Sequence, residues 1–442
     1  MSIKSLTLQG TTKGSTEGIS LSGFKHSSVL LTCASLLFKN TVHFLNAPLK
    51  IRDIEVLTDY IKNSGGIIHR DYLQSSLSIS SEKFMYDPTF PIPNQNVHGT
   101  LYLFPVLLSY NQQVMFPSAG GCQIGTEGTR PTNHIIEVCK LFGACFFNKD
   151  NHLYGKWDKK ADVEIDILKL TGVAIDSPFV SGATKTAILM AAASGYSTTI
   201  KNHYCKQDVL DLLKFLKKQG LDISVQQNSI IIKTKNVNIP KITTHEIPPD
   251  SIEAVTYIAS SFFLKTALTI KTTRLYELLE DIKDEIATFK QMGFKFSIEA
   301  SSAMKIFPPI KIKSQDITIT SATMYSDSQP FFLCLNIFGD REAKIVDKVW
   351  PRRFHIAKEL TKLNAQFEPI EDGIIIIPSK LKVLDNVLNS HDLRGFVGQF
   401  ILSSSLQEMI IINDFHHVYR GYNNFIDSFQ QIGFIFEANQ NA

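Results

Sequence analysis

The sequence has few of the residues that would mark a disulfide-stabilised, metal-binding or membrane protein. Only six cysteines occur in 442 residues, and no two of them form a CxxC pair or another metal-ligand spacing. In a chain of this size they are typical of the reduced thiols of a cytoplasmic protein. No apolar run approaches the roughly 18 residues that span a bilayer, and the first residues lack the apolar core of a signal peptide. We therefore expect a cytoplasmic protein with no membrane contact and no metal site.

The sequence also lacks an excess of charge of either sign. It has 45 Lys and Arg residues against 42 Asp and Glu residues, a net charge of +3, which argues against a dedicated nucleic-acid binder. The hydrophobic share of 44% and the charged share of 20% are ordinary for a soluble globular protein. A chain of 442 residues is too long for one compact core, so two domains are the natural expectation.

Glycine is concentrated in residues 118–131, which read Ser-Ala-Gly-Gly-Cys-Gln-Ile-Gly-Thr-Glu-Gly-Thr-Arg-Pro. Such density is typical of a loop that moves or that lays its backbone against a ligand. The thiol of Cys122 could act there as a nucleophile or a proton donor, and Arg130 would favour its thiolate form. The alternative is a mobile surface loop that carries an incidental cysteine.

An internal repeat organises the rest of the chain. Six times, an amphipathic helical pattern ends at a Gly or Asn and leads into a short strand, with 69 to 78 residues between successive copies. A Gly or Asn at this point favours a left-handed helix cap. The six pivots are Gly65, Gly143, Gly220, Gly293, Asn364 and Gly433.

Each repeat carries a second helix that is apolar nearly all round, which is typical of a helix buried inside a domain. Polar or charged residues cluster where these helices start. Helix N-termini carry unsatisfied N–H groups, so converging starts favour an anion site, although the acidic residues could instead be simple N-caps. We expect the six starts near His26, His98, Ala183, Ser251, Asp327 and Asp392.

The repeats divide three and three. The polar, proline-containing stretch at 233–249 follows the third copy and is typical of a linker. Residues 18–23 precede the first copy, and they predict a second point at which the chain crosses between the two domains. We expect one domain at 22–246, including the loop at 118–131, and a second domain formed by 1–21 and 247–442, with a ligand site between them.

Six short motifs occur in order along the chain: Leu21-Ser-Gly-Phe-Lys25, Gly120-Gly-Cys-Gln-Ile-Gly125, Thr129-Arg-Pro131, Ser181-Gly-Ala-Thr184, Asp392-Leu-Arg394 and Tyr419-Arg-Gly-Tyr422. Together they resemble the enolpyruvyl transferase family over essentially the whole chain. The likeness is nearer to the UDP-N-acetylglucosamine branch than to the 5-enolpyruvylshikimate-3-phosphate branch. The resemblance implies an α/β fold of two inside-out α/β barrel domains, each built from three βαβαββ units around buried helices.

The resemblance also implies a reaction. Enzymes of this family move the enolpyruvyl group of phosphoenolpyruvate to an acceptor hydroxyl through a tetrahedral ketal and release phosphate. That chemistry needs cations for a trianionic donor, a base for the hydroxyl and an acid for the methylene carbon. No cofactor is implied. The expected cationic contacts are Lys25, Arg130, Arg352, Arg394 and Arg420, where Arg suits bidentate clamping and Lys acts as a point charge.

Three further residues resemble the family's catalytic groups. Cys122 matches the loop thiol that protonates the methylene carbon. Asp327 matches the carboxylate that takes the acceptor's proton, with a plain helix cap as the alternative. Asp392 matches the carboxylate that positions the arginine network.

The acceptor is where the sequence departs from the family pattern. His26 stands where the amino-sugar enzymes have an asparagine that contacts the sugar, and His98 replaces an expected arginine. Asn133, after Pro131, stands where the family has an aspartate lining the uracil pocket, and Ser181 and Gly182 are further expected contacts. A uridine nucleotide remains the expected partner, with UDP-N-acetylglucosamine placed narrowly ahead of UMP and its 3′-hydroxyl.

Two other classes remain open. A non-catalytic member could keep only nucleotide binding, although the retained Lys25, Cys122 and Asp327 oppose this. An RNA 3′-terminal phosphate cyclase, which has similar repeats, is disfavoured by the low net charge. We expect no nucleic-acid partner and a monomer or a weak homo-oligomer.

Overall fold

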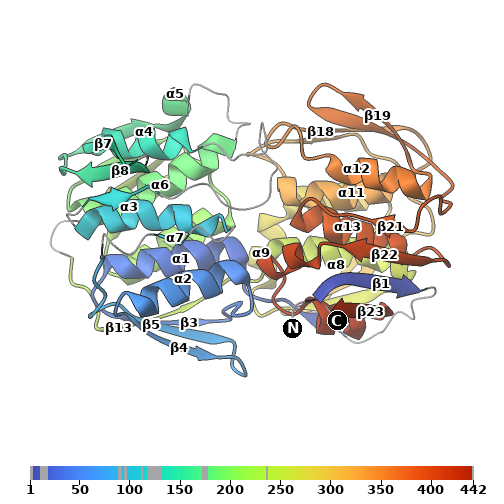
Figure 1. The fold of residues 1–442 in the computed structure, drawn as a ribbon, viewed down its shortest axis with the longest axis horizontal. Helices are drawn as coiled ribbons and strands as arrows, with labels where there is room; N and C mark the ends of the chain where they lie inside the picture. Colours follow the sequence, from blue (N-terminus) through green and yellow to red (C-terminus); the bar gives the residue numbers. More distant parts are fainter. Residues whose placement is uncertain are drawn as a thin grey trace. The chain divides into compact units, whose positions relative to one another are not determined.

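The computed structural model describes residues 3–9, 18–87, 92–93, 97–110, 113–116, 132–150, 152–171, 178–234 and 237–440. The chain forms two compact units, and it passes between them at Ser22–Gly23 and at Pro248–Pro249. We call the unit that begins at Gly23 the N-terminal unit and the unit that contains Pro249 onward, together with the first 22 residues, the C-terminal unit (Figure 1). Cys122, Arg130 and Pro131 lie outside the described residues.

The N-terminal unit follows the predicted alternation of helices and short strands. Its first repeat contains α1 (Lys25–Ala34), η1 (Ser35–Leu37), β3 (Thr41–Leu45), α2 (Arg52–Asn63), β4 (Ile67–Asp71) and β5 (Ser76–Ser80). Its second contains η2 (Gly99–Tyr102), α3 (Leu103–Leu107), η3 (Leu108–Tyr110), β6 (Val114–Met115), α4 (Asn133–Leu141), β7 (Ala144–Lys149) and β8 (His152–Trp157). Its third contains β9 (Val163–Asp166), α5 (Ile167–Thr171), α6 (Pro178–Ser194), β10 (Thr198–Lys201), α7 (Gln207–Lys218), β11 (Asp222–Gln226), β12 (Ser229–Lys233) and β13 (Ile242–Glu246).

The C-terminal unit repeats this plan. It begins with β1 (Ile3–Gln9) and β2 (Ile19–Ser20) and continues with α8 (Ser251–Leu264), β14 (Leu268–Lys271), α9 (Leu275–Asp281), α10 (Lys283–Gln291), β15 (Lys295–Ala300) and β16 (Ala303–Phe307). The next repeat has β17 (Ile317–Ile319), η5 (Ser326–Ser328), α11 (Gln329–Asn336), β18 (Ala343–Asp347), α12 (His355–Leu360), η6 (Thr361–Leu363), β19 (Gln366–Ile370) and β20 (Gly373–Ile377). The last has β21 (Val387–Leu388), α13 (Leu393–Ser403), β22 (Met409–Asn413), η7 (Phe415–Arg420), α14 (Phe425–Gln431) and β23 (Phe436–Gln440).

The strands of the described residues form six small sheets, so the fold is mixed α/β. Five of the sheets have one design, in which three antiparallel strands carry a parallel strand at one edge: β13-β3-β5-β4, β11-β12-β10-β9, β15-β16-β14-β2, β17-β18-β20-β19 and β21-β22-β1-β23. The sixth, β6-β8-β7, has its three antiparallel strands within the described residues. The N-terminal strand β1 lies between β22 and β23, and therefore ties the two ends of the chain together.

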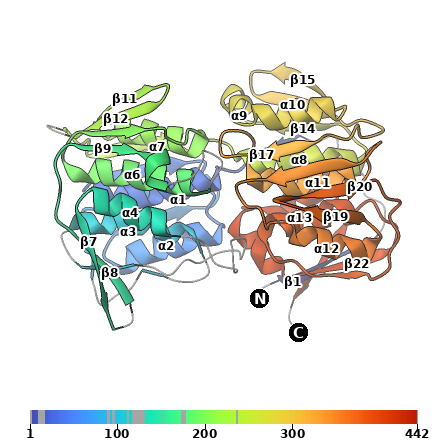
Figure 2. The same ribbon diagram turned by 90° about the horizontal axis from the view of Figure 1, so that it is seen from above.

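Apolar helices occupy the interior of each unit. In the C-terminal unit α8, α11 and α13 contact one another, and in the N-terminal unit α3 contacts both α1 and α6. Figure 2 shows the three C-terminal helices toward the centre of their unit and strands such as β15 and β22 toward its margins. Every residue of α11 and α13 is buried, as expected of helices that are apolar nearly all round. Among the described helices none has the length and apolar character needed to cross a bilayer.

The six predicted pivots are confirmed. The five glycines have φ between 88° and 109°, and Asn364 has φ of 65°. At Gly143 the backbone is also crowded, because an added Cβ would lie 2.2 Å from the carbonyl oxygen of Asp158. Left-handed backbone is costly for residues with a Cβ, and this close approach adds a second reason for glycine.

One predicted helix start is wrong. The third buried helix, expected near Ala183, begins at Pro178 and runs to Ser194. Proline is favoured in a helix's first turn, where its missing N–H costs nothing. Ser181 and Gly182 therefore lie within the helix and not at its start. An added Cβ at Gly182 would lie 2.1 Å from Nε2 of His134, so α6 packs closely on α4 at this point.

Substituting the pivot Gly143 and a second glycine with positive φ, Gly195, separates backbone strain from crowding. Gly195 has φ of 82° and nothing within 4 Å of an added Cβ, so Gly195→Ala should cost only the left-handed strain, about 1 kcal/mol. Gly143→Ala should cost about 3 kcal/mol, because strain and the clash with Asp158 add. In a thermal melt we expect the larger fall in Tm for Gly143→Ala, by roughly 2–4 °C per kcal/mol. Equal falls would show that crowding at Gly143 is relieved by local movement.

Candidate active site

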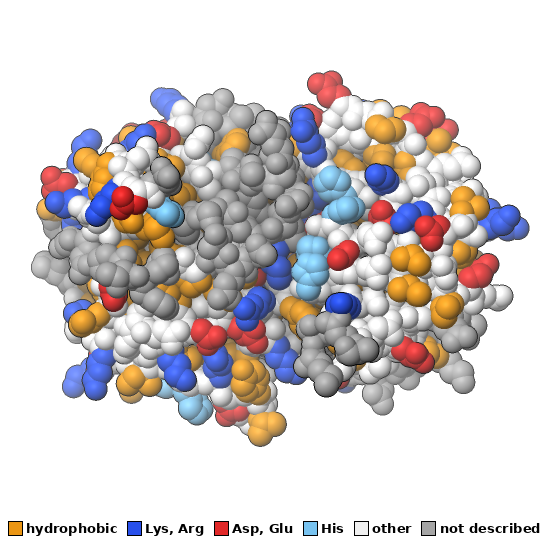
Figure 3. Space-filling view, in the orientation of Figure 1, with side chains coloured by type: hydrophobic (Ala, Val, Ile, Leu, Met, Phe, Trp, Pro, Cys, Tyr) orange, Lys and Arg blue, Asp and Glu red, His pale blue; other side chains and the backbone are white. Residues whose placement is uncertain are grey.

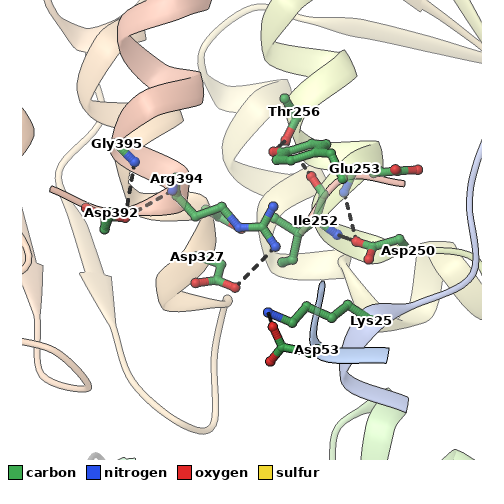
Figure 4. Close-up of polar contacts among 12 residues, drawn as sticks. Lys25, Asp53, Asp250, Ile252, Glu253, Thr256, Asp327, Asp392, Arg394 and Gly395 are labelled. Carbon is green, nitrogen blue, oxygen red and sulfur yellow. Dashed lines mark hydrogen bonds and ion pairs between the residues drawn. The ribbon is translucent and has the colours of Figure 1, made fainter. Parts of the chain in front are cut away.

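Asp327 of the C-terminal unit lies between two arginines that come later in the chain, Arg353 and Arg394. Arg353 Nη1 is 2.5 Å from Asp327 Oδ1. Arg394 Nη2 is 3.5 Å from Asp327 Oδ2 (Figure 4). The arginine side chains are 4% and 1% exposed, whereas that of Asp327 is 20% exposed. Two buried cations therefore hold a carboxylate that solvent can still reach.

The acidic residues at the helix starts divide into two kinds. The Asp250 side chain accepts hydrogen bonds from the backbone N–H groups of Ile252 and Glu253, and Asp392 accepts from those of Arg394 and Gly395. These two residues are N-caps, as the sequence left open. Asp327 is the middle residue of η5, and its carboxylate pairs with Arg353 and Arg394. These ion pairs favour a role beyond that of a plain cap.

Asp392 also ties the arginines together. Its Oδ1 accepts from the backbone N–H of Arg394 at 3.0 Å and lies 3.3 Å from Arg353 Nη2. Arg353 thus bridges Asp327 and Asp392. The bridge holds its guanidinium in one orientation, because charge-assisted hydrogen bonds from both ends of a planar group fix its plane.

Arg394 lies over an aromatic ring. Its Cζ is 5.0 Å from the ring centroid of Tyr422, whose hydroxyl hydrogen-bonds Thr256 Oγ1 at 2.7 Å. Two of the buried guanidinium nitrogens, Nε and Nη1, have no hydrogen-bond acceptor among the described residues. A buried arginine with unused donors suits an anionic ligand.

Glu253 is a second buried acid in this unit. Its carboxyl oxygens accept from the backbone N–H of Ser22 at 2.8 Å and from the Ser22 hydroxyl at 3.0 Å. Burial and then the charge of Asp250 raise the pKa of Glu253 to about 8, against smaller opposing effects of Ser22 and Arg394. At neutral pH the carboxyl is therefore mostly protonated, and it anchors Ser22, the last residue before the chain leaves this unit.

The N-terminal unit gathers a different set of charges at its helix starts. Lys25, the first residue of α1, is 8% exposed, and its Nζ lies 3.5 Å from Asp53 Oδ2 on α2 (Figure 4). Asp53 Oδ1 accepts from the backbone N–H of Gly99, the first residue of η2, at 3.4 Å. His98 immediately precedes η2, and its ring lies 6.3 Å from that of Tyr102.

The structure distinguishes two neighbouring arginines. Arg352, the residue singled out from the sequence, is exposed, whereas Arg353 is buried in the carboxylate bridge.

Arg420 is 8% exposed at the end of η7. Asn133 is exposed at the first position of α4, and His26 is partly buried beside Lys25.

Sequence reasoning missed Arg353, Asp53 and Glu253. The pair Arg352-Arg353 gives no sequence signal for which side chain turns inward, because it lies in a turn closed by Arg353 N–H to Trp350 O and not in a periodic element. Asp53 and Glu253 lie in the first turns of helices, where acids are common surface residues. Only their burial, at 1% and 2% exposure, sets them apart.

The raised pKa of Glu253 predicts a pH-dependent stability. The folded protein keeps the proton up to about pH 8, whereas the unfolded chain loses it near pH 4.5. The stability that this carboxyl contributes is therefore complete below pH 4.5 and is lost as pH rises toward 8, by up to about 1.4 kcal/mol per pH unit. Glu253→Gln imitates the protonated form and should remove this part of the slope. Melting curves between pH 5 and 9 that stay parallel for both proteins would contradict the shift.

Surface charge on the face drawn in Figure 3 is mixed, with acidic and basic side chains interspersed on both units. This agrees with the net charge of +3. The charges that matter for the site are the buried ones described above.

Comparison with known proteins identifies the family. Residues 12–429 match the family model described as EPSP synthase (3-phosphoshikimate 1-carboxyvinyltransferase). The UDP-N-acetylglucosamine 1-carboxyvinyltransferases of Carboxydothermus hydrogenoformans and Halothermothrix orenii are each 26% identical, over 94% of this chain and 94% and 95% of theirs.

Solved structures share the fold. The enolpyruvyl transferase NikO from Streptomyces tendae has a TM-score of 0.89 at 23% identity, with both chains covered completely. EPSP synthase from Acinetobacter baumannii has a TM-score of 0.69 at 15% identity, over 99% of this chain and all of that one. The family match extends over nearly the whole sequence, and the chain therefore belongs to the EPSP synthase family of 1-carboxyvinyl (enolpyruvyl) transferases.

Proposed function

We propose that this enzyme transfers the enolpyruvyl group of phosphoenolpyruvate to a hydroxyl of a uridine nucleotide and releases phosphate, with UMP as the acceptor. The observation that carries the proposal is the Asp327 carboxylate held between the buried guanidinium groups of Arg353 and Arg394. It combines, in one place, the anion-binding groups and the base that the family's reaction needs.

The donor would bind to the arginines of the C-terminal unit. Phosphoenolpyruvate presents a phosphate and a carboxylate, both of which suit guanidinium donors. Arg394 has donors in reserve, and Arg353 and Arg420 are buried with it. When a donor anion takes these cations, Asp327 loses its counter-ions and becomes a stronger base for the acceptor hydroxyl. Asp392 would keep Arg353 and Arg394 in place during that exchange.

The remaining roles are inferred from the family resemblance. Lys25 and Arg130 would contact the donor, and Cys122 would protonate the methylene carbon; of these only Lys25 lies in the described part of the chain. We also propose that each unit is an inside-out barrel, in which its three small sheets surround the buried helices, and that residues 22–246 form one such domain. The plan that five of the sheets share supports this proposal.

UMP is preferred to UDP-N-acetylglucosamine because of the residues that are expected to contact the acceptor. The relatives named for UDP-N-acetylglucosamine share only 26% of their residues with this chain. His26 stands where the resemblance places an asparagine that contacts the sugar, His98 replaces an expected arginine, and Tyr102 lies beside His98. The imidazole of His26 is larger than the side chain of the expected asparagine and suits a more compact acceptor. UDP-N-acetylglucosamine remains the second candidate, on its frequency among the relatives.

Phosphate release tests the function directly. Purified protein with phosphoenolpyruvate should release phosphate with UMP, and not with shikimate 3-phosphate. Turnover with UDP-N-acetylglucosamine alone would move the acceptor to the second candidate. If the protein binds a uridine nucleotide but shows no turnover with any of these three acceptors, the proposed function is wrong and the protein is a non-catalytic member of the family.

The two neighbouring arginines offer a matched pair of variants. Arg353→Lys removes a planar group that spans Asp327 and Asp392, and we expect kcat/KM to fall by about 100-fold or more, the loss usual for one transition-state donor. Arg352→Lys alters an exposed side chain and should change kcat/KM by less than about twofold. Melting curves of both variants would control for folding. The opposite ranking, with Arg352 sensitive and Arg353 tolerant, would contradict the assignment.

A further inference from the structure

The segment that carries Asp327 is short. η5 has three residues, Ser326–Ser328, and it is closed by a hydrogen bond from the N–H of Ser328 to the carbonyl oxygen of Tyr325 at 2.9 Å. A single 3-10 turn has poor hydrogen-bond geometry and little stability of its own. Contacts from other elements therefore decide how firmly Asp327 is held.

Glu285 of α10 holds both ends of η5. Its Oε1 accepts from the backbone N–H of Tyr325 at 2.7 Å and from the hydroxyl of Ser328 at 3.1 Å. Glu285 is 0% exposed, and hydrogen bonds in such a dry environment are stronger than in water. One carboxylate oxygen thus holds the residue before η5 and the last residue of η5, with Asp327 between them.

Asp347, the last residue of β18, joins η5 to the turn that carries Arg353. Its Oδ2 accepts from the hydroxyl of Ser326. Its Oδ1 accepts from the backbone N–H groups of Val349 and Trp350, both at 2.9 Å, and the N–H of Arg353 then closes the turn on Trp350 O at 3.0 Å. Asp347 therefore holds η5 with one oxygen and the arginine's turn with the other.

Tyr325 is also held by its side chain. Its hydroxyl lies 2.9 Å from both carboxylate oxygens of Asp281, which also accepts from the hydroxyl of Ser251 at 2.5 Å. Asp281 ends α9, and Ser251 begins α8. The residue before η5 is thus fixed at its N–H by Glu285 and at its ring by Asp281.

The two fully buried carboxyl groups are costly where they lie. Glu285 and Asp347 are 0% exposed. Burial raises the pKa of Asp347, against smaller opposing effects of the Ser326 hydroxyl, the Trp350 N–H and the charge of Arg353. Apolar side chains of similar size would fill the same space at a smaller cost. What the carboxyl groups add is acceptor oxygens directed at η5 and at the turn before Arg353.

We infer that Glu285 and Asp347 are positioning residues for the proposed reaction. They hold η5 so that the carboxylate of Asp327 keeps one orientation beside its two arginines. A reacting group misplaced by about 1 Å can lose about 100-fold in rate. The inference rests on the proposed function, in which Asp327 is the base. Both residues act through Asp327, and no bond forms or breaks at either of them.

Paired substitutions at Glu285 test its hydrogen bonds. Glutamine keeps an acceptor oxygen, so Glu285→Gln should hold kcat within about threefold of the unmodified protein. Glu285→Leu removes the acceptor, and kcat with the uridine nucleotide that turns over should fall by about 10- to 100-fold. The KM for phosphoenolpyruvate should stay within about threefold, because the arginines are not altered. Hydrogen exchange over residues 321–330, followed by mass spectrometry, should become faster in Glu285→Leu and not in Glu285→Gln.

Substitutions at Asp347 should have a different signature, because this residue holds two elements. Asp347→Asn can accept from the turn through its amide oxygen and donate to Ser326 through its amide nitrogen, so it should resemble the unmodified protein. Asp347→Ala frees both η5 and the turn before Arg353, and it should lower kcat and raise the KM for phosphoenolpyruvate together. Ser326→Ala frees η5 alone and should lower kcat by about 10-fold without changing that KM.

Asn336 offers a matched control in the same part of the unit. It is 0% exposed and ends α11, the helix that begins directly after η5. Its side chain holds the backbone of Gln315 through two hydrogen bonds, at 3.1 Å and 3.3 Å. Asn336→Ala removes buried polar contacts as Glu285→Leu does, so it should lower Tm to a similar degree and leave kcat unchanged.

The outcomes separate this inference from the proposed function. If the unmodified protein turns over no uridine nucleotide, the function and the inference are both wrong. If it does turn over and Glu285→Leu lowers Tm but not kcat, as in Asn336→Ala, the carboxyl groups are structural and only the inference is wrong. An equal loss of kcat in Glu285→Gln and Glu285→Leu would also overturn it, because charge and not hydrogen bonding would then matter. Should Glu285→Leu fail to fold, an unchanged kcat in Ser326→Ala overturns the inference.

Discussion

The site depends on one contact that recurs between consecutive repeats: a polar side chain near the start of an amphipathic helix meets the start of the next buried helix. Asp53 near the start of α2 accepts from Gly99 of η2. Glu285 in α10 accepts from the N–H of Tyr325 and the hydroxyl of Ser328, at η5. Arg353 before α12 contacts Asp392 before α13. Because the buried helices pack together in each unit, these contacts bring charged groups to one end of that unit.

Such charges are costly to bury unless each has a partner. The C-terminal unit meets this condition with carboxylates that serve twice. Asp392 caps α13 and also holds Arg353, while the cap of α8 by Asp250 lies beside the protonated Glu253. Burial, and then repulsion from Asp250, disfavour the charged form of Glu253, and both raise its pKa. A ligand anion can replace a carboxylate as the partner of an arginine, and the network then remains satisfied.

The sequence allowed the repeat to be predicted in detail, because the features that define it are local. A Gly or Asn at a helix end and an apolar helix can be recognised without knowledge of the fold, and all six pivots have positive φ. The site was only partly predictable. Asp327 and Arg394 were named through the family resemblance, but the inward turn of Arg353 and the contacts of Glu285 and Asp347 with η5 depend on distant segments. The start of α6 was placed too late because the polar Ser181-Gly182 resembles a cap, whereas the helix begins at Pro178.

The core residues and the residues at the helix starts are separate, and this separation explains how one fold can serve different acceptors. The cores of α1 and of the helices around it are apolar, and residues such as Leu30, Leu31 and Leu103 are almost fully buried. His26 and His98 lie at the starts of these elements and are only partly buried, so they contribute little to that core. A change at a helix start therefore has a small cost in stability, whereas a change at a pivot such as Gly143 alters the backbone itself. Under the proposed function, acceptor choice can diverge while the arginines proposed to bind the donor, which are tied into the carboxylate network, stay fixed.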